Sequence, residues 1–68
     1  MSKTNIKKKY VVSLLFNLRQ GGYLHQSMRV ILCEAVSEEE AFGIAYEEVK
    51  DEKEGWELSI KVVTNVSK

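Results

Sequence analysis

Two side chains in this sequence commonly act as a base or a nucleophile: His25, the single imidazole, and Cys33, the single thiol. A catalytic histidine needs a nucleophile and an orienting carboxylate beside it. No Gly-x-Ser-x-Gly, His-x-x-x-His or Cys-x-x-Cys pattern accompanies either residue. One cysteine and one histidine cannot form a four-ligand zinc site, and a lone cysteine forms no intrachain disulfide. We therefore expect no enzyme activity, no metal and no cofactor, with Cys33 acting as a small hydrophobe inside a strand.

Hydrogen-bonding and stacking groups gather around the glycine pair Gly21-Gly22. Residues 20–26 also contain a tyrosine, a histidine and two glutamines, and an arginine lies on each side of the segment. The pair lacks the further glycines and the strand-to-helix context of a phosphate-binding loop, so it predicts a turn. His25 is then either an exposed loop residue or a ligand contact. If the chain binds a small anionic ligand, the candidate residues are Arg19, Tyr23, His25 and Arg29.

Charge is distributed unevenly along a chain whose formal net charge is zero. Residues 38–54 contain eight acids and two lysines, a net charge of −6, so the rest of the chain carries +6. An acidic helix in this segment is a second candidate surface, for a protein partner. Its candidate residues are Glu39, Glu40, Gly43, Glu47 and Asp51. The lysines at 7–9 lie on a terminus with little to bury, which favours a solvated tail over a nucleic-acid site.

Hydrophobic periodicity predicts one α+β domain over residues 1–68 with the element order ββαβ. Residues 1–8 read as a flexible, basic N-terminus. Alternation of period two predicts two strands joined by a loop, and Ser37-Glu38-Glu39-Glu40 is a capping-box pattern that begins a helix. Gly55 fits the position that follows a helix. The expected elements are a strand over 9–19, a loop over 20–26, a strand over 27–36, a helix over 37–54 and a strand over 56–66.

A right-handed crossover places the third strand parallel to the second, with the first strand between them. The predicted fold is a three-stranded antiparallel sheet in the order 2-1-3, half of a ferredoxin-like layer, with the helix on one face. One helix leaves the second face uncovered, although that face also holds apolar residues. Those expected there are Val11, Leu15, Ile31, Cys33, Ala35 and Val63.

A 68-residue chain buries only about 60% of its unfolded surface, so an apolar second face favours association between copies. We expect a homo-oligomer, a dimer or higher, built face to face or edge to edge. The helix glycine Gly43, predicted to face outward, joins the candidate interface residues because close approach of another chain would explain it. No apolar run approaches the ~20 residues of a membrane span, and Met1–Lys9 lacks a signal-peptide core, so a cytoplasmic location without membrane contact is expected.

Three segments resemble small proteins of bacteriophages and prophages: Tyr10-Val-Val-Ser-Leu-Leu-Phe-Asn-Leu-Arg-Gln-Gly-Gly-Tyr-Leu-His-Gln-Ser, Ala35-Val-Ser-Glu-Glu-Glu-Ala-Phe-Gly and Gly55-Trp-Glu-Leu-Ser. The resemblance covers most of the chain but includes no diagnostic motif, and it transfers no functional residue. It implies a setting in which very small proteins counter host defences by sequestering a nucleotide signal or blocking a host protein.

The sequence thus leaves two main functional hypotheses. In the first, a homo-oligomeric, non-enzymatic protein sequesters a small anionic ligand of the nucleotide type. In the second, an inhibitor or adaptor uses its acidic helix to block a host protein.

Overall fold

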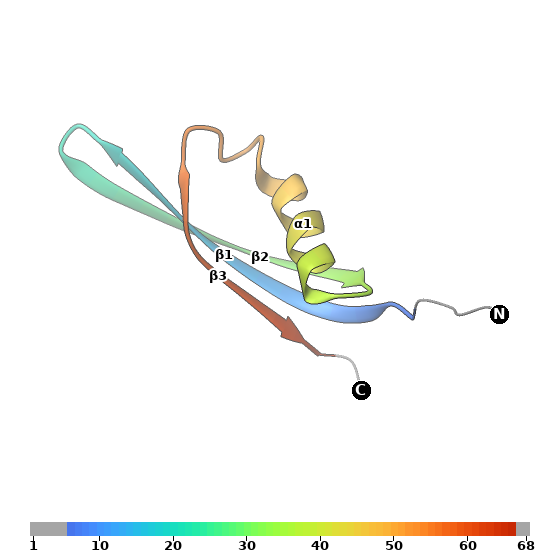
Figure 1. The fold of residues 1–68 in the computed structure, drawn as a ribbon. Helices are drawn as coiled ribbons and strands as arrows, with labels where there is room; N and C mark the ends of the chain where they lie inside the picture. Colours follow the sequence, from blue (N-terminus) through green and yellow to red (C-terminus); the bar gives the residue numbers. More distant parts are fainter. Residues whose placement is uncertain (1–5, 67–68) are drawn as a thin grey trace.

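The computed structural model describes residues 6–66. Its elements, in chain order, are β1 (Lys8–Gln20), β2 (Tyr23–Ala35), α1 (Glu38–Val49) and β3 (Glu57–Asn65). The sheet order is β2-β1-β3, and β1 is antiparallel to both neighbours (Figure 1). This confirms the predicted α+β fold with its ββαβ order, 2-1-3 sheet and single helix.

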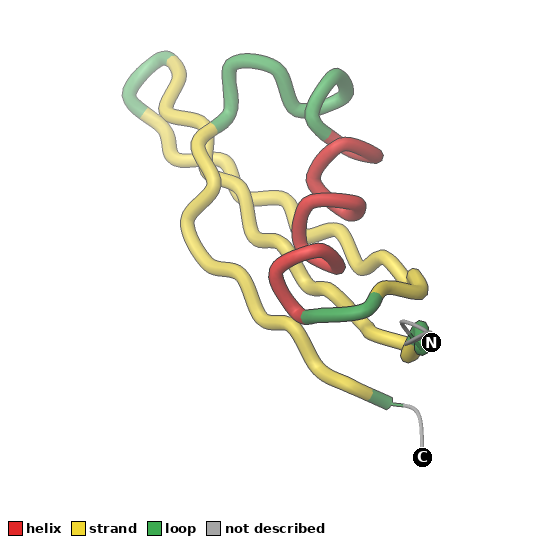
Figure 2. The backbone as a smooth tube through the Cα atoms, turned by 45° about the vertical axis from the view of Figure 1, so that its right-hand side comes forward, coloured by secondary structure: helices red, strands yellow, loops and turns green. Residues whose placement is uncertain are grey.

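The core lies between α1 and one face of the sheet (Figure 2). Every second residue of β1 faces the helix, because successive side chains of a strand point to opposite faces. The small side chains of α1 let the helix approach the sheet closely, which buries its inner stripe completely. The buried residues are Tyr10, Val12, Leu14, Phe16, Ala35, Ala41, Ala45 and Val49.

The hairpin between β1 and β2 turns on two residues alone, Gly21 and Gly22, whose φ angles are +61° and +83°. Two successive positive φ angles match the right-handed twist of the flanking strands, so no longer loop is needed. Tyr23 therefore pairs directly with Gln20, and residues 23–26 belong to β2. The predicted loop over 20–26 is wrong for this reason.

α1 begins as predicted at a capping box. The Glu40 amide donates to the Ser37 hydroxyl oxygen at 3.1 Å. The Glu40 carboxylate accepts from the Val36 amide at 2.7 Å, so it reaches one residue further back than the usual capping box.

α1 ends at Val49, earlier than the predicted Glu54. The last helical turn contains no basic residue, and acids there interact unfavourably with the negative end of the helix dipole. A series of turns follows, and Gly55, with a φ of +91°, precedes β3. Gly55 therefore closes this connection and not the helix itself.

β3 contains a bulge that sequence alternation does not reveal. Leu15 pairs with Ile60, whereas Phe16 pairs with Leu58, so Ser59 is an extra residue. An extra residue reverses the alternation of the strand on one side of the bulge. Leu58 and Val63 consequently both pack against the core on the helix side.

The molecule is elongated, with a radius of gyration of 14.5 Å against about 11 Å for a compact chain of this length. The pairing of β3 with β1 stops at Asn17, so the hairpin continues beyond β3 as a two-stranded arm over residues 18–25. Figure 1 shows this arm reaching away from α1.

The expected flexible terminus at residues 1–8 is wrong at Lys8, which begins β1 opposite Ala35. Residues 1–5 of that prediction lie outside the described residues. Within residues 6–66, no helix combines the length and apolar character needed to cross a membrane.

Candidate functional site

The face of the sheet that points away from α1, here called the open face, is the main candidate surface. Residues directly opposite each other in an antiparallel pair point to the same side of the sheet. Val11 pairs with Leu32 and Thr64, while Leu15 pairs with Met28 and Ile60. Along the three-stranded part of the sheet, the apolar members of the open face are thus Val11, Leu15, Met28, Val30, Leu32, Ile60 and Val62.

The outer strands leave their open-face side chains in water. Met28, Val30, Leu32, Ile60 and Val62 are between 51% and 68% exposed. Val11 and Leu15 of the central strand are half-buried by these neighbours. A contiguous apolar surface on all three strands of one sheet is unusual for a solitary small protein, which makes the open face the candidate interaction surface.

Charged residues of the open face lie at its two ends. Lys9 and Glu34 are directly opposed at one end. Arg19 lies at the other end, where Glu57 pairs with Asn17. Asn17 also accepts a hydrogen bond from the Gln26 amide at 3.1 Å. Between these ends the face contains the apolar residues and two small hydroxyl side chains, Ser13 and Thr64.

The predicted second face is correct at two of its six positions. Val11 and Leu15 lie on the open face, but Ile31, Cys33 and Val63 pack on the helix side, and Ala35 is fully buried there. The two-residue turn sets this register by pairing Val12 with Ile31. Met28, Val30 and Leu32 take the places expected for Ile31, Cys33 and Ala35. The Gly-Gly pair is the sequence signal that identifies these three residues, whereas nothing in the sequence marks the bulge that exposes Ile60 and Val62.

Gly43 lies exposed on the outer surface of α1, as predicted. A Cβ atom added there would meet nothing within 4 Å. Packing within the protomer therefore gives no reason for a glycine at this position.

The four predicted ligand contacts do not converge. Tyr23 and His25 are exposed on the arm and share one face of β2 with Arg29, whereas Arg19 lies on the opposite face of the sheet. The Arg29 guanidinium forms an ion pair with the Glu52 carboxylate. Arg29 is therefore occupied within the protomer, and Arg19 is separated from Tyr23 and His25 by the sheet.

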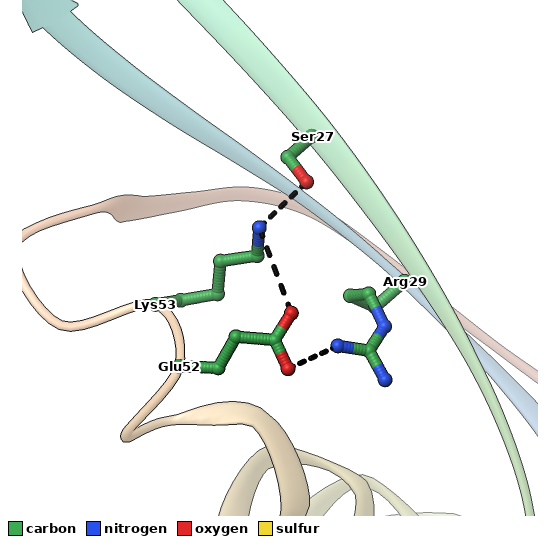
Figure 3. A network of polar contacts seen from close by, with 4 residues as sticks. All are labelled: Ser27, Arg29, Glu52 and Lys53. Atoms are coloured by element: carbon green, nitrogen blue, oxygen red, sulfur yellow. Dashed lines mark hydrogen bonds and ion pairs between the residues drawn. The ribbon is translucent and has the colours of Figure 1, made fainter.

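Arg29 belongs to a polar network that fastens the turn after α1 to β2 (Figure 3). The Lys53 ammonium donates to the Ser27 hydroxyl at 2.7 Å and lies 3.9 Å from the Glu52 carboxylate. It also lies 4.7 Å from the centre of the Trp56 ring. The hydrogen bond from Arg29 is the main cause that lowers the pKa of Glu52, and the same bond raises the pKa of Arg29. This network is structural, since it orients the connection that leads into β3.

The surroundings of Cys33 favour the thiol over the thiolate. Its Sγ donates to the Ala41 carbonyl oxygen at 3.6 Å. Burial is the main cause that raises its pKa, and the nearby Glu40 carboxylate raises it further. His25 lies eight residues away on the same strand, about 26 Å at 3.3 Å per residue. The two side chains therefore cannot act as a nucleophile and its base.

A shallow groove of about 290 Å³ lies between the first turn of α1 and β3. The Lys61 ammonium lies 4.2 Å from the centre of the Phe42 ring on its wall. The groove is lined by Glu38, Glu39, Phe42, Lys61 and Val63. It combines opposite charges around a small apolar floor, and sequence reasoning did not identify it.

The outer side of α1 presents the predicted acidic surface. Glu39, Glu47 and Asp51 are exposed, and Lys50 lies 3.1 Å from the Glu47 carboxylate. Glu40 is instead engaged by its hydrogen bond to the Val36 amide. Among residues 6–66, no His, Cys, Asp and Glu side chains gather in a group suited to a metal ion.

Comparison with known proteins adds nothing to this description: no family model, no curated protein and no solved structure matches the chain.

Proposed function

We propose that this chain is a non-enzymatic binding protein that functions as a homo-oligomer. The observation that carries the proposal is the exposure of the apolar side chains of the open face. Each alternates along its strand with residues of the helix side, so the sheet is apolar on both faces while α1 covers one. Apolar surface left in water forgoes about 25 cal/mol per Å². Association between copies recovers that free energy.

The size of the protomer core supports the same proposal. Eight of the residues between 6 and 66 form the buried core, and three of these eight are alanines. A domain of this length has a marginal core of its own, and association is a common source of additional stability when disulfides are absent. Cys33 is a free thiol, so no intrachain disulfide provides that stability.

The positions of the reactive side chains support a binding role over a catalytic one. The Cys33 thiol donates to a helix carbonyl and has a raised pKa, and His25 lies on the arm far from it. A nucleophile needs a base within hydrogen-bond reach.

The mass in solution tests the proposal. We expect sedimentation velocity at micromolar concentrations to give at least twice the protomer mass of 7.8 kDa. Progressive dilution should shift the distribution toward the protomer. A mass of one protomer at every concentration up to the solubility limit would overturn the proposal.

A second candidate function is capture of a basic partner by the outer side of α1. The observation that favours it is the exposure of the acidic residues Glu39 and Glu47 on α1 and of Asp51 in the turn that follows it. Fluorescence anisotropy with an arginine-rich peptide tests it: binding should weaken with salt and be lost in a Glu39→Lys, Asp51→Lys variant. Equal binding by the wild type and this variant would refute it.

A further inference from the structure

We propose that the homo-oligomer is a dimer in which two copies pack their open faces together, giving four layers in the order helix, sheet, sheet, helix. This inference rests on the proposed self-association and names its surface and its occupant, a second copy of this chain. Sheets that pack in this way bury their facing side chains in a common core about 10 Å thick.

The area of the open face is sufficient for such a dimer. The three strands contain 13, 13 and 9 residues. With a rise of about 3.3 Å per residue and a strand spacing of about 4.8 Å, the sheet covers about 550 Å². Two copies would thus bury at least about 1,100 Å², which passes the ~1,000 Å² expected of a biological interface.

The distribution of charged side chains on the open face favours binding of a second copy of the chain. The middle of the open face contains no charged side chain, so pairing desolvates none at its centre. Each end carries one base and one acid: Lys9 with Glu34, and Arg19 with Glu57. Whichever end of the partner lies opposite, the rim therefore brings together equal numbers of positive and negative charges. Such self-complementarity is the requirement of a two-fold symmetric interface.

Pairing at the strand edges is the alternative mode of association, but it does not explain the exposed apolar side chains of the open face. The β3 edge contains the bulge at Ser59, which disrupts regular addition of a strand. The β2 edge is regular over 13 residues and is available for pairing. A sheet extended through β2 would still leave the apolar open face of each copy in water, and would join the two into one larger exposed surface. Covering that surface requires face-to-face packing.

The variant Val30→Lys tests this surface. Val30 pairs with Ser13 in the middle of the open face and is 58% exposed, so lysine there disturbs little within the protomer. In a symmetric dimer the change places two ammonium groups in the apolar interface, so we expect the dissociation constant to rise by about a hundredfold or more. The matched control is Ile44→Lys, which adds the same charge at an exposed apolar residue on α1.

Sedimentation velocity and circular dichroism give the readout. The inference predicts that Val30→Lys has the protomer mass and a folded spectrum, while Ile44→Lys keeps the dimer mass. If Val30→Lys does not fold, Val30→Thr, which keeps the branched shape, should still raise the dissociation constant several-fold. A dimer mass for folded Val30→Lys would overturn face-to-face packing and leave self-association intact. A wild-type chain that is itself a protomer would refute self-association.

Discussion

Cys33 is protected by its surroundings in two ways. Burial and Glu40 raise the pKa of the thiol, and its hydrogen bond to the Ala41 carbonyl holds it against α1. Only the thiolate reacts with alkylating agents. We therefore predict that iodoacetamide at mildly alkaline pH modifies Cys33 several-fold more slowly in the folded protein than in urea.

The control for this experiment places a cysteine on the arm. Tyr23 is 73% exposed, so a Tyr23→Cys, Cys33→Ala variant should react at similar rates with and without urea. Equal rates for native and unfolded Cys33 would show that the environment described above does not protect the thiol.

The ion pair between Arg29 and Glu52 predicts a dependence of stability on pH. The hydrogen bond from Arg29 lowers the folded-state pKa of Glu52 below its ordinary value of 4.5. A carboxylate with a lowered pKa contributes stability above its unfolded-state pKa and loses that contribution as the pH falls through its folded-state pKa. The free energy of unfolding lost in Glu52→Gln should thus be larger at pH 7 than at pH 3, as measured by urea denaturation.

An Arg29→Gln background separates this pair from other titrating groups. There, the loss caused by Glu52→Gln should differ much less between the two pH values, because the hydrogen bond and charge of Arg29 are already removed and only Lys53 still lowers the pKa of Glu52. A loss that does not depend on pH in the wild-type background would contradict the assigned role of the pair.

At the scale of elements, substitution by alanine should have opposite effects on the free energy of unfolding at two glycines. Gly22 has a φ of +83° in the hairpin turn, where an alanine side chain is strained. Gly22→Ala should lower the free energy of unfolding by about 1 kcal/mol. Gly43 lies in α1 with open space around its Cα, so Gly43→Ala should raise it by about 0.5–1 kcal/mol.

Urea denaturation of the two variants checks both signs under the same conditions. A stabilised Gly22→Ala would show that the turn tolerates other φ angles. A destabilised Gly43→Ala would indicate that another chain approaches Gly43 too closely for a Cβ atom, and such a variant should also self-associate more weakly.

The elements also show how far the sequence could predict this fold. Period-two alternation in β1 and the Ser37 capping box are local signals, and both agree with the structure. The lack of a basic residue in the last turn of α1 is a local signal against a longer helix, but the contacts that Glu52 and Lys53 make with β2 after the helix are contained in no local pattern. The bulge at Ser59 depends likewise on pairing with β1.

The sequence was sufficient to predict that an uncovered apolar face exists, but it identified only some of the residues on that face. The existence of this face follows because a single helix can cover only one side of a sheet that is apolar on both sides. Its membership depends on strand register, and a shift of one residue moves every side chain to the other face. Treating Gly21-Gly22 as a two-residue turn would have placed Met28, Val30 and Leu32 there. The ligand contacts failed to converge for a related reason, since Arg19 and Tyr23 lie on opposite faces of the same hairpin.

At the scale of the whole molecule, the two sides of the protomer are chemically distinct. The helix side contains the acidic residues of α1 and the polar network around Lys53, and α1 covers the hydrophobic core on this side. The open face has charges only at its ends. In the proposed dimer, an equivalent layer would cover this apolar side, while both acidic helices would stay in contact with water.

Thermal unfolding should then depend on protein concentration. A partner that binds only the folded chain raises its stability by mass action. The enthalpy of unfolding is about 0.7 kcal/mol per residue, summed over the two chains of the dimer. With this enthalpy, each tenfold change in protein concentration shifts the Tm by about 5 °C. We expect calorimetry of the wild type to show this shift, and Val30→Lys to unfold at one lower Tm at all concentrations. A wild-type Tm that is constant over a hundredfold range of concentration would mean that the open face stays in water in the native state.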